Sequence, residues 1–168
     1  MNKKPALFLD RDGVINIDYG YVFQKEKFDF IDGIFEFVKY FFNKGFEIII
    51  ITNQSGIARK YYTESDFQNI SKYMFDRFLD NGIKISKIYH CPCHPKFSDN
   101  CECRKPKPHM ILQANSDFNL DLTSSILVGD SKTDIEAGQK AGIVQNYLFQ
   151  IESTSFQQLL DLIVGKTH

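Results

Sequence analysis

Five short apolar runs, which alternate with segments of helical spacing, constrain the fold of this chain more than any other feature of its sequence. Each run is apolar at consecutive positions, as is typical of strands buried on both faces of a parallel sheet. Strands alternating with helices predict an α/β protein with a Rossmann-like, doubly wound parallel sheet, whose ligand site lies beyond the carboxyl ends of the strands. The runs are ALFLD (6–10), FEIIIIT (46–52), KISKIYH (84–90), SSILVGD (124–130) and VQNYLF (144–149).

Helical patterns fill the intervals between these runs. Thr63 opens TESD, a capping-box pattern, before an apolar face that is expected to continue to Leu79. Gly45 stands where a glycine after a helix C-terminus is expected, and Pro108 suits a first helical turn. We expect the aromatic-rich helix faces to lie in the core. The helices are predicted over about 34–42, 63–79, 108–114 and 133–141, with a last one from 154 or 155.

Length and charge narrow the class of protein. A chain of 168 residues fits one domain, and we expect a single domain over residues 1–168. A formal net charge of −1 provides no basic field that would attract nucleic acid or an anionic membrane, so neither is expected as a partner. The apolar stretch at residues 6–9 is too short for a signal peptide, and no later run reaches transmembrane length. We therefore expect a cytoplasmic protein, taken as a monomer, with reduced thiols.

Two aspartates follow the first apolar run. LFLDRDGVIN places Asp10 at the end of the run and Asp12 two residues later, so extended geometry aims both carboxylates to one side. Gly13 lets the chain turn away from them. This pair suits a nucleophile and a general acid/base. Taken alone, an Asp-Gly turn after a strand explains the pattern equally well.

Further polar side chains follow or precede other runs, at positions that place reactive and phosphate-binding groups at the same edge of the sheet. Singly, most of them are typical of turns and helix caps. Because the carboxyl ends of parallel strands meet at one edge, carboxylates, hydroxyls and a lysine are expected in one crevice. They are Thr52, Asn53, Gln54 and Ser55 after the second run, Lys105 before the fourth, and Asp130 and Asp134 after the fourth.

All four cysteines fall in one short segment as two C-x-C pairs, Cys91 with Cys93 and Cys101 with Cys103. Disulfides are not expected, because residues at i and i+2 rarely meet the S–S torsion and the compartment is reducing. Thiols acting as small hydrophobes are not typical of so polar a loop. Tetrahedral zinc is favoured, and four protein ligands leave no open position, so this zinc is expected to be structural.

The zinc is expected to fix the loop that delivers Arg104 and Lys105. His94 is an alternative to Cys93 and would give a Cys₃His site. Otherwise His90 and His94 are expected to be solvated loop residues.

In this order the motifs resemble the haloacid dehalogenase (HAD) superfamily of aspartyl phosphotransferases, from about Ala6 to Ala141. The resemblance implies that Asp10 attacks phosphorus to form an aspartyl phosphate. It implies that Asp12 protonates the leaving alkoxide and then activates water. Thr52 and Lys105 would hold the phosphoryl oxygens.

The same resemblance implies that Mg²⁺ binds Asp10, the backbone carbonyl of Asp12, and Asp130, with Asp134 in a supporting position. The need for a cation also has an independent physical reason. A carboxylate that approaches a phosphate dianion meets a repulsion of about 4 kcal/mol per charge pair at about 4 Å, for an effective dielectric constant of about 20. Mg²⁺ and Lys105 offset this repulsion, so almost no turnover is expected without the metal.

A narrower resemblance rests on FLDRDGVIN, DYGYV, FDFIDG, TNQSGIAR, CECRKPKP and VGD taken together. These motifs resemble a zinc-containing subfamily of bacterial HAD phosphatases that act on heptose bisphosphates, and they are also similar to histidinol-phosphate phosphatase domains. The chain departs from the subfamily pattern in four places. Cys93 replaces a usual histidine ligand, the loop between the cysteine pairs is shorter, Val14 replaces a common threonine, and Ser131 replaces a frequent lysine. A thiolate in place of histidine still suits zinc.

The resemblance implies hydrolysis of the 7-phosphate of D-glycero-D-manno-heptose 1,7-bisphosphate, a small sugar bisphosphate, in the synthesis of nucleotide-activated heptose. Arg104 would bind the phosphate that is not cleaved, because its planar fork suits bidentate phosphate binding. About forty residues separate Asp10 from Thr52, which excludes a large inserted cap domain and leaves the site to be shaped by loops. The substrate-lining residues so implied are Asp18, Tyr19, Gly20, Tyr21, Thr52, Asn53, Gln54 and Ser55.

Three alternatives stay open on the sequence alone. Histidinol phosphate, or another small sugar phosphate, is an alternative substrate for the same chemistry. A phospho-accepting receiver module has a similar α/β fold with acids at strand ends, but Asp12 beside Asp10 favours turnover over a lasting aspartyl phosphate. A zinc-ribbon interaction module would leave the strand-end acids without a role.

Overall fold

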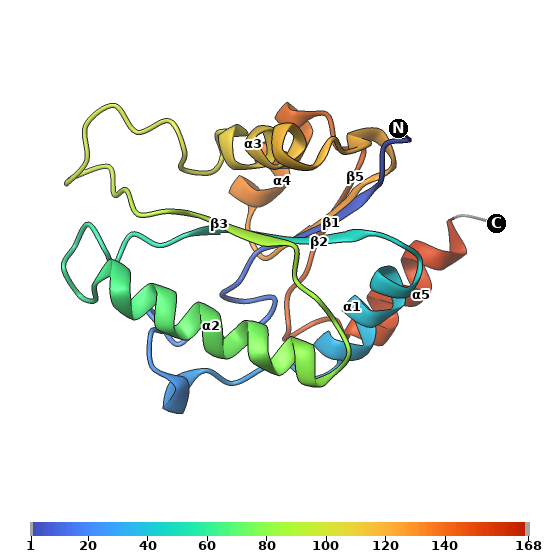
Figure 1. The fold of residues 1–168 in the computed structure, drawn as a ribbon, viewed down its shortest axis with the longest axis horizontal. Helices are drawn as coiled ribbons and strands as arrows, with labels where there is room; N and C mark the ends of the chain where they lie inside the picture. Colours follow the sequence, from blue (N-terminus) through green and yellow to red (C-terminus); the bar gives the residue numbers. More distant parts are fainter. Residues whose placement is uncertain (1, 167–168) are drawn as a thin grey trace.

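The computed structural model describes residues 2–166, which contain a parallel sheet of five strands (Figure 1). The strand order is β3–β2–β1–β4–β5. Each apolar run contributes one strand, so the predicted α/β, doubly wound sheet is confirmed. The strands are β1 (Ala6–Leu9), β2 (Glu47–Asn53), β3 (Lys87–Cys91), β4 (Ile126–Gly129) and β5 (Gln145–Leu148).

The helices of the described residues are α1 (Ile34–Asn43), α2 (Glu64–Asp80), α3 (His109–Phe118), α4 (Lys132–Ala141) and α5 (Phe156–Gly165). Leu7 and Leu9 of β1 pack in one core with α1, α2 and α5, whereas Phe8 packs in a second core with α3 and α4. Successive side chains of a strand point to opposite faces, so helices bury both faces of the sheet. Figure 1 shows these two helix layers below and above the sheet. No helix in this part of the chain has the length and apolar character that a membrane span requires.

The predicted cap of α2 is confirmed, but one predicted core residue is not. Thr63 Oγ1 accepts a hydrogen bond from the Asp66 backbone N–H at 3.0 Å, and the Asp66 carboxylate accepts one from the Thr63 N–H at 2.8 Å. Leu79, by contrast, is 63% exposed, so its placement on the core face is wrong. Phe78 is fully buried at this end of the helix, and the following residue is rotated by about 100° away from the core.

The sheet has its topological switch point between β1 and β4. β1 pairs with β2 on one side and with β4 on the other. The chain continues outward from β2 to β3, and from β4 it continues outward to β5 at the opposite edge of the sheet. Ligands of such sheets bind in the crevice at this point. Asp10 and Asp130 follow the two strands directly and therefore lie at the crevice.

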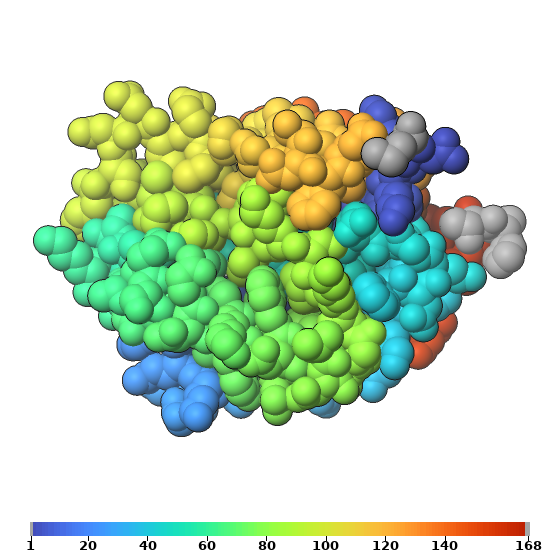
Figure 2. Space-filling model, in the orientation of Figure 1, coloured from blue at the N-terminus to red at the C-terminus, as the bar shows by residue number. Residues whose placement is uncertain are grey.

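Two loops extend beyond the same edge, as Figure 1 shows at the left of the view. One is the segment 54–63 between β2 and α2; the other holds the four cysteines, and we call residues 90–104 the cysteine loop. The loops contact one another directly, since the Ala58 N–H donates to the Pro92 carbonyl oxygen at 3.2 Å. Figure 2 shows them as adjoining teal and yellow surfaces.

Candidate active site

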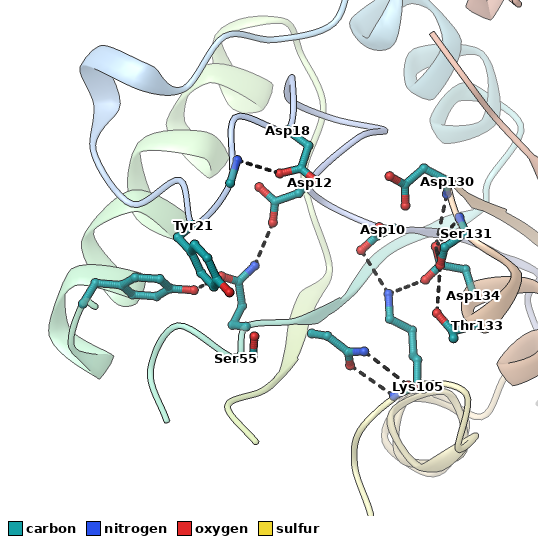
Figure 3. A pocket seen from close by; sticks show the side chains of 14 residues that line it. Asp10, Asp12, Asp18, Tyr21, Ser55, Lys105, Asp130, Ser131, Thr133 and Asp134 are labelled. Carbon is teal, nitrogen blue, oxygen red and sulfur yellow. Dashed lines mark hydrogen bonds and ion pairs between the residues drawn. The ribbon is translucent and has the colours of Figure 1, made fainter. Parts of the chain in front are cut away.

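A buried lysine lies among carboxylates where β1 and β4 end (Figure 3). Lys105 Nζ donates hydrogen bonds to Asp10 Oδ1 at 3.0 Å and to the Ile51 carbonyl oxygen at 2.9 Å, and it pairs with Asp134 Oδ1 at 2.5 Å. Ligand oxygens of Asp10, Asp130 and Asp134 lie within 4.8 Å of one another. The structure therefore brings together Asp10, Lys105 and Asp130, which are far apart in the sequence.

Burial and like charges govern the electrostatics of this centre. Burial raises the pKa of Asp10 well above its usual value; Lys105 lowers it, and Asp134, Asp130 and Asp12 raise it further. Burial also raises the pKa of Asp130. Burial opposes the charged form of Lys105, but Asp10 and Asp134 outweigh this effect, so the pKa of Lys105 is raised. One ammonium thus faces several carboxylates, and this excess of negative charge suits a divalent cation with oxygen ligands.

Asp134 has its carboxylate committed to the protein. Its Oδ2 accepts hydrogen bonds from the backbone N–H groups of Asp130 at 3.1 Å and Ser131 at 3.2 Å, and from the Ser131 hydroxyl. Its other oxygen pairs with Lys105. Asp134 therefore holds the turn that presents Asp130, which agrees with the supporting position expected for it.

Gly13 is required where it stands. Its φ of +89° lies in the left-handed region that favours glycine, and a Cβ at this position would collide with Asp130 Oδ2. The expected turn after Asp12 is thus present, and it also allows the first loop to approach the Asp130 carboxylate.

Asp12 is held by three side-chain donors. Its Oδ1 accepts hydrogen bonds from Arg11 Nη2 at 2.9 Å and Asn16 Nδ2 at 3.0 Å, and its Oδ2 accepts one from Gln54 Nε2 at 3.0 Å. Arg11 is fully buried and also donates to the Val22 carbonyl oxygen at 2.6 Å. Arg11 and Asn16 were not singled out from the sequence, although both stand inside the motif FLDRDGVIN.

A cavity of about 380 Å³ lies above these groups. Both Asp10 and Asp12 line it, as the spacing of the two aspartates predicts. Most of the predicted substrate residues line it too. The full lining is Asp10, Asp12, Asp18, Gly20, Tyr21, Asn53, Gln54, Ser55, Tyr62, Lys105, Asp130, Ser131, Thr133 and Asp134.

Three of the predicted catalytic and substrate-binding residues do not line this cavity. Tyr19 is exposed and its hydroxyl donates to Asp29 Oδ2 at 2.7 Å. Thr52 is buried below the cavity, where its Oγ1 accepts a hydrogen bond from Gln54 Nε2 at 2.8 Å. Arg104 is the last residue of the cysteine loop, and its Nη1 donates to the Cys93 carbonyl oxygen of the same loop at 3.1 Å.

The Asn53 side chain binds the backbone of Lys105, which its position in the sequence does not indicate. Its Oδ1 accepts a hydrogen bond from the Lys105 backbone N–H at 3.1 Å, and its Nδ2 donates to the Lys105 carbonyl oxygen at 3.3 Å. The side chain therefore fixes the backbone that delivers Lys105 to Asp10.

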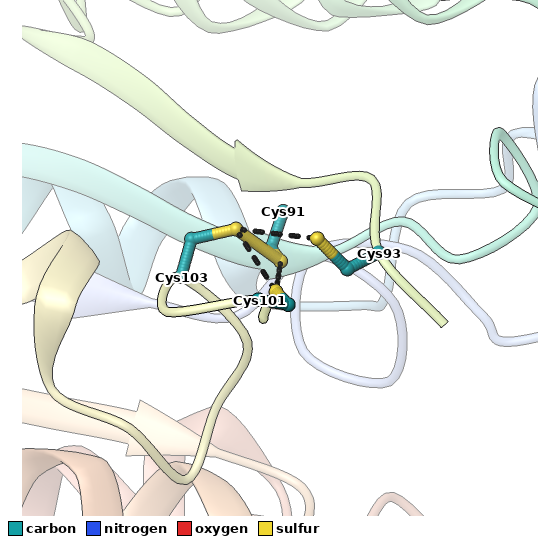
Figure 4. Close-up of side chains that lie close together, drawn as sticks. All are labelled: Cys91, Cys93, Cys101 and Cys103. Atoms are coloured by element: carbon teal, nitrogen blue, oxygen red, sulfur yellow. Dashed lines mark hydrogen bonds between the residues drawn. A yellow bond between two sulfur atoms is a disulfide. The ribbon is translucent and has the colours of Figure 1, made fainter. Parts of the chain in front are cut away.

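The four cysteine sulfurs gather at the base of the cysteine loop (Figure 4). The sulfur of Cys101 lies 3.4 Å from that of Cys91 and 3.6 Å from that of Cys103, and the sulfurs of Cys93 and Cys103 are 3.8 Å apart. Sulfurs bound to one tetrahedral zinc at about 2.3 Å lie about 3.8 Å apart, so the donor set fits this metal.

The structure also joins Cys91 to Cys103 as a disulfide and leaves Cys93 and Cys101 free. No disulfide was expected. Cysteines two positions apart rarely form a disulfide, but this pair is separated by 12 positions and closes the loop with Cα atoms 5.5 Å apart.

The expectation that both histidines are solvated loop residues is wrong for His90, whereas His94 does lie in the loop and is half-buried there. His90 lies in β3, stacks on Phe67 at a ring distance of 4.1 Å and pairs with Glu64. His94 Nε2 lies 2.7 Å from Arg59 Nη2. Cys93, not His94, belongs to the sulfur cluster.

Arg59 is a residue that sequence reasoning missed. Its guanidinium lies over the rings of Tyr21 and Phe97, at 6.0 and 5.7 Å, and so joins three separate loops. Burial, then Arg59, Arg104 and Lys96, lower the pKa of His94, because each positive charge disfavours a further one. Positive charge is therefore concentrated around His94, and Arg59 connects it to Tyr21 in the wall of the cavity.

The profile of the HAD-hydrolase-like family matches residues 102–146, which contain Lys105 and Asp130. Together with the Asp10–Lys105 pair at the switch point of a parallel sheet, this match indicates a HAD-type hydrolase.

Two curated relatives are more specific. The chain is 53% identical over 141 residues to the D-glycero-alpha-D-manno-heptose-1,7-bisphosphate 7-phosphatase of Campylobacter jejuni, with 84% of this chain and 80% of the relative covered. It is 43% identical over 174 residues to the D-glycero-beta-D-manno-heptose-1,7-bisphosphate 7-phosphatase of Helicobacter pylori, with 97% and 99% covered. This chain therefore belongs to the D-glycero-D-manno-heptose-1,7-bisphosphate 7-phosphatase family of HAD-type phosphatases, which are phosphoric monoester hydrolases.

A solved structure agrees with this family. The crystal structure of D,D-heptose 1,7-bisphosphate phosphatase from B. bronchiseptica, complexed with magnesium and phosphate, matches with a TM-score of 0.84 and 25% identity, covering 96% of this chain and 99% of that one.

Proposed function

We propose that this protein removes the 7-phosphate of D-glycero-D-manno-heptose 1,7-bisphosphate and leaves the anomeric phosphate, in the synthesis of nucleotide-activated heptose. The observation that carries the proposal is the buried Asp10–Lys105 pair at the switch point, beside Asp12 in one cavity. The relatives named for this activity include both an alpha-anomer and a beta-anomer enzyme.

The reaction uses two aspartates in two steps. A carboxylate oxygen of Asp10 bonds to phosphorus while the bond from phosphorus to the sugar oxygen breaks, and that oxygen keeps the electron pair. Asp12 donates a proton to this oxygen, and the sugar leaves. Asp12 then takes a proton from water, whose oxygen attacks the aspartyl phosphate, so that phosphate is released and Asp10 is regenerated. Lys105, which lines the cavity, would hold the phosphoryl oxygens, and Thr52 would do so only if the phosphate reached its buried hydroxyl.

Asp10, the backbone carbonyl of Asp12, and Asp130 are the groups that would hold Mg²⁺. Oxygen ligands and an excess of negative charge around Lys105 fit this hard cation. When bound, Mg²⁺ neutralises charge on the meeting anions and on the transferred phosphoryl group. Asp134 would support Asp130, because the Asp134 carboxylate accepts a hydrogen bond from the Asp130 backbone N–H.

A substrate with two phosphates agrees with the positive charge around His94, which Arg59 connects to Tyr21 in the wall of the cavity. Arg104, the residue proposed for the second phosphate, lies with Arg59 and Lys96 around His94. Histidinol phosphate has a single phosphate, so these positively charged side chains would have no second phosphate to bind. Only one short 3₁₀ helix, Lys25–Lys27, interrupts residues 10–33, which supports a single domain whose cavity is shaped by loops. A cytoplasmic location and a monomeric state stay predictions.

Replacing Arg104 with alanine tests the bisphosphate substrate. KM for the heptose bisphosphate should rise by at least about tenfold, because charge-assisted hydrogen bonds to the second phosphate are lost, while KM for a simple monophosphate should change little. Arg77→Ala, which removes an exposed arginine on α2, serves as the charge-matched control. An equal rise of KM for both substrates would count against the proposed role.

We also propose that Cys91, Cys93, Cys101 and Cys103 bind one structural zinc ion. The sulfur spacing supports this site, and four protein ligands leave no position for a reacting group. Zinc would fix the loop that carries Arg104 and Lys105. It requires all four thiolates, and it therefore excludes the Cys91–Cys103 disulfide in the same molecule.

Metal and thiol content distinguish these two states of the loop. Purified protein should contain about one zinc ion per chain by elemental analysis. After unfolding in chelator without reductant, all four cysteines should react with a thiol reagent. Two reactive thiols and no zinc would instead establish the disulfide. Cys101→Ser should lower zinc content and melting temperature, whereas Lys96→Ala in the same loop should leave zinc content unchanged.

A further inference from the structure

A chain of three side chains connects a buried tyrosine to the general acid/base. The Tyr62 hydroxyl is hydrogen-bonded to Gln54 Oε1. Gln54 Nε2 lies 3.0 Å from Asp12 Oδ2 and 2.8 Å from Thr52 Oγ1. Gln54 was expected to bind substrate, but it is 2% exposed and its amide is fully used by these three partners.

Hydrogen-bond valence fixes the direction of every bond in this chain. An ionised Asp12 only accepts, so Gln54 must present its NH₂ group to the carboxylate. Its oxygen then faces Tyr62, and the phenol must donate. The second N–H of Gln54 is directed at Thr52 Oγ1, which accepts it. The structure records no bond donated by the Thr52 hydroxyl to another described residue.

The same count assigns the proton of Asp12 to one oxygen. Arg11 and Asn16 both donate to Oδ1 and occupy its acceptor sites, whereas Gln54 alone donates to Oδ2. Oδ2 is therefore the oxygen that carries the proton for the leaving group. The orientation of the Gln54 amide matters when Oδ2 is protonated. If the amide rotated by 180°, the Gln54 oxygen would accept this proton and hold it away from the leaving group.

Tyr62 is built into the protein in a way that prevents this turn. Its ring is 4% exposed and stacks on Phe23 at 5.2 Å. A Cβ at Gly56 would collide with the ring, so glycine there makes room for it. Burial raises the pKa of Tyr62 to about 12, so the phenol stays protonated and remains a donor at neutral pH.

We propose that Tyr62 is a positioning residue for proton transfer, which acts by holding the Gln54 amide oxygen away from Asp12. This inference rests on the proposed function only through the role of Asp12 as general acid. When the proton passes from Asp12 Oδ2 to the sugar oxygen, the bond from phosphorus to that oxygen breaks and its electron pair accepts the proton. Tyr62 does not touch the reacting atoms.

Leaving-group dependence tests the role. Tyr62→Phe keeps the stacked ring and removes only the hydroxyl. For a primary alkyl phosphate such as glycerol 3-phosphate, kcat/KM should fall by about tenfold to a hundredfold, because an alkoxide needs the proton in order to leave. For p-nitrophenyl phosphate the fall should be less than about threefold, because this leaving group departs without a proton. The parameter kcat/KM reports the steps up to loss of the leaving group, and so excludes the later attack by water.

Two further variants serve as a control and as a test of the route through Gln54. Tyr147→Phe is the matched control, since Tyr147 is a buried tyrosine on β5 whose hydroxyl donates to Gln145 Oε1 at 3.1 Å, away from the site. It should leave both kcat/KM values unchanged. In a Gln54→Met background, Tyr62→Phe should cause no further fall, because the effect passes through Gln54.

The outcomes separate this inference from the proposed function. Equal losses for the alkyl and aryl esters, no loss for either, or a full additional loss in the Gln54→Met background would overturn the role of Tyr62. Poor hydrolysis of the heptose bisphosphate by the wild type, with the alkyl-to-aryl contrast retained, would overturn the substrate and leave the role of Tyr62 in place.

Discussion

Replacing Asp10 with asparagine should lower kcat by roughly 10⁴-fold or more, because the amide oxygen cannot form the phosphoenzyme that the first step requires. The side chains have nearly the same shape, so the fold should persist. Steady-state phosphate release measures the loss, and a rapid-quench experiment with labelled substrate should find no covalent phosphate on the variant.

The control for this variant is Asp161→Asn, which makes the same change at an exposed position on α5. Its kcat should equal that of the wild type. The far-ultraviolet circular dichroism and the zinc content of Asp10→Asn should be unchanged as well. Turnover by Asp10→Asn near the wild-type rate would sink the assignment of the nucleophile.

Removing divalent cations should abolish turnover almost completely. Without Mg²⁺, a phosphate dianion would face Asp10, Asp12 and Asp130, which are offset by Lys105 and by the Arg11 guanidinium paired with Asp12. Each remaining pair of like charges costs about 4 kcal/mol at about 4 Å for an effective dielectric constant of about 20. Activity should return when Mg²⁺ is added after dialysis against a chelator. Zinc content is measured in parallel, so that loss of the structural ion is not mistaken for loss of the catalytic one.

Asp130→Asn gives this prediction a second, non-kinetic measurement. The Mg²⁺ concentration needed for half of the maximal rate should rise by at least about tenfold, since a charged ligand is lost. Mg²⁺ should also raise the melting temperature of the wild type more than that of the variant, because a ligand that binds only the folded state stabilises it. Full activity in chelator would contradict the proposed metal dependence.

The fold and the placement of the reacting groups could be predicted because each depends on a strong local pattern. The run FEIIIIT is apolar at consecutive positions and predicts a strand that is buried on both faces. Once the sheet is parallel, Asp10 and Asp130 must lie at the same edge, whatever the details of the loops. Their meeting follows from topology and needs no knowledge of side-chain contacts.

Other features depended on contacts that no local pattern encodes. Asn53 and Gln54 stand next to one another in TNQSG, yet one binds the Lys105 backbone and the other binds Asp12. Arg59 and Tyr62 act through partners that only the folded loops bring near. The Cys91–Cys103 pair likewise joins the two C-x-C pairs, and the spacing within each pair carries no information on bonds between them.

Relative kcat/KM across a panel of phosphoesters tests the central claim most directly. The panel holds both anomers of D-glycero-D-manno-heptose 1,7-bisphosphate, histidinol phosphate and a generic sugar monophosphate, with the products of the bisphosphates assigned by ³¹P NMR. One heptose bisphosphate anomer should exceed every monophosphate by at least about a hundredfold, and its product should keep the anomeric phosphate, because the second phosphate adds binding that a monophosphate lacks. A higher kcat/KM for histidinol phosphate, or release of the anomeric phosphate, would contradict this account.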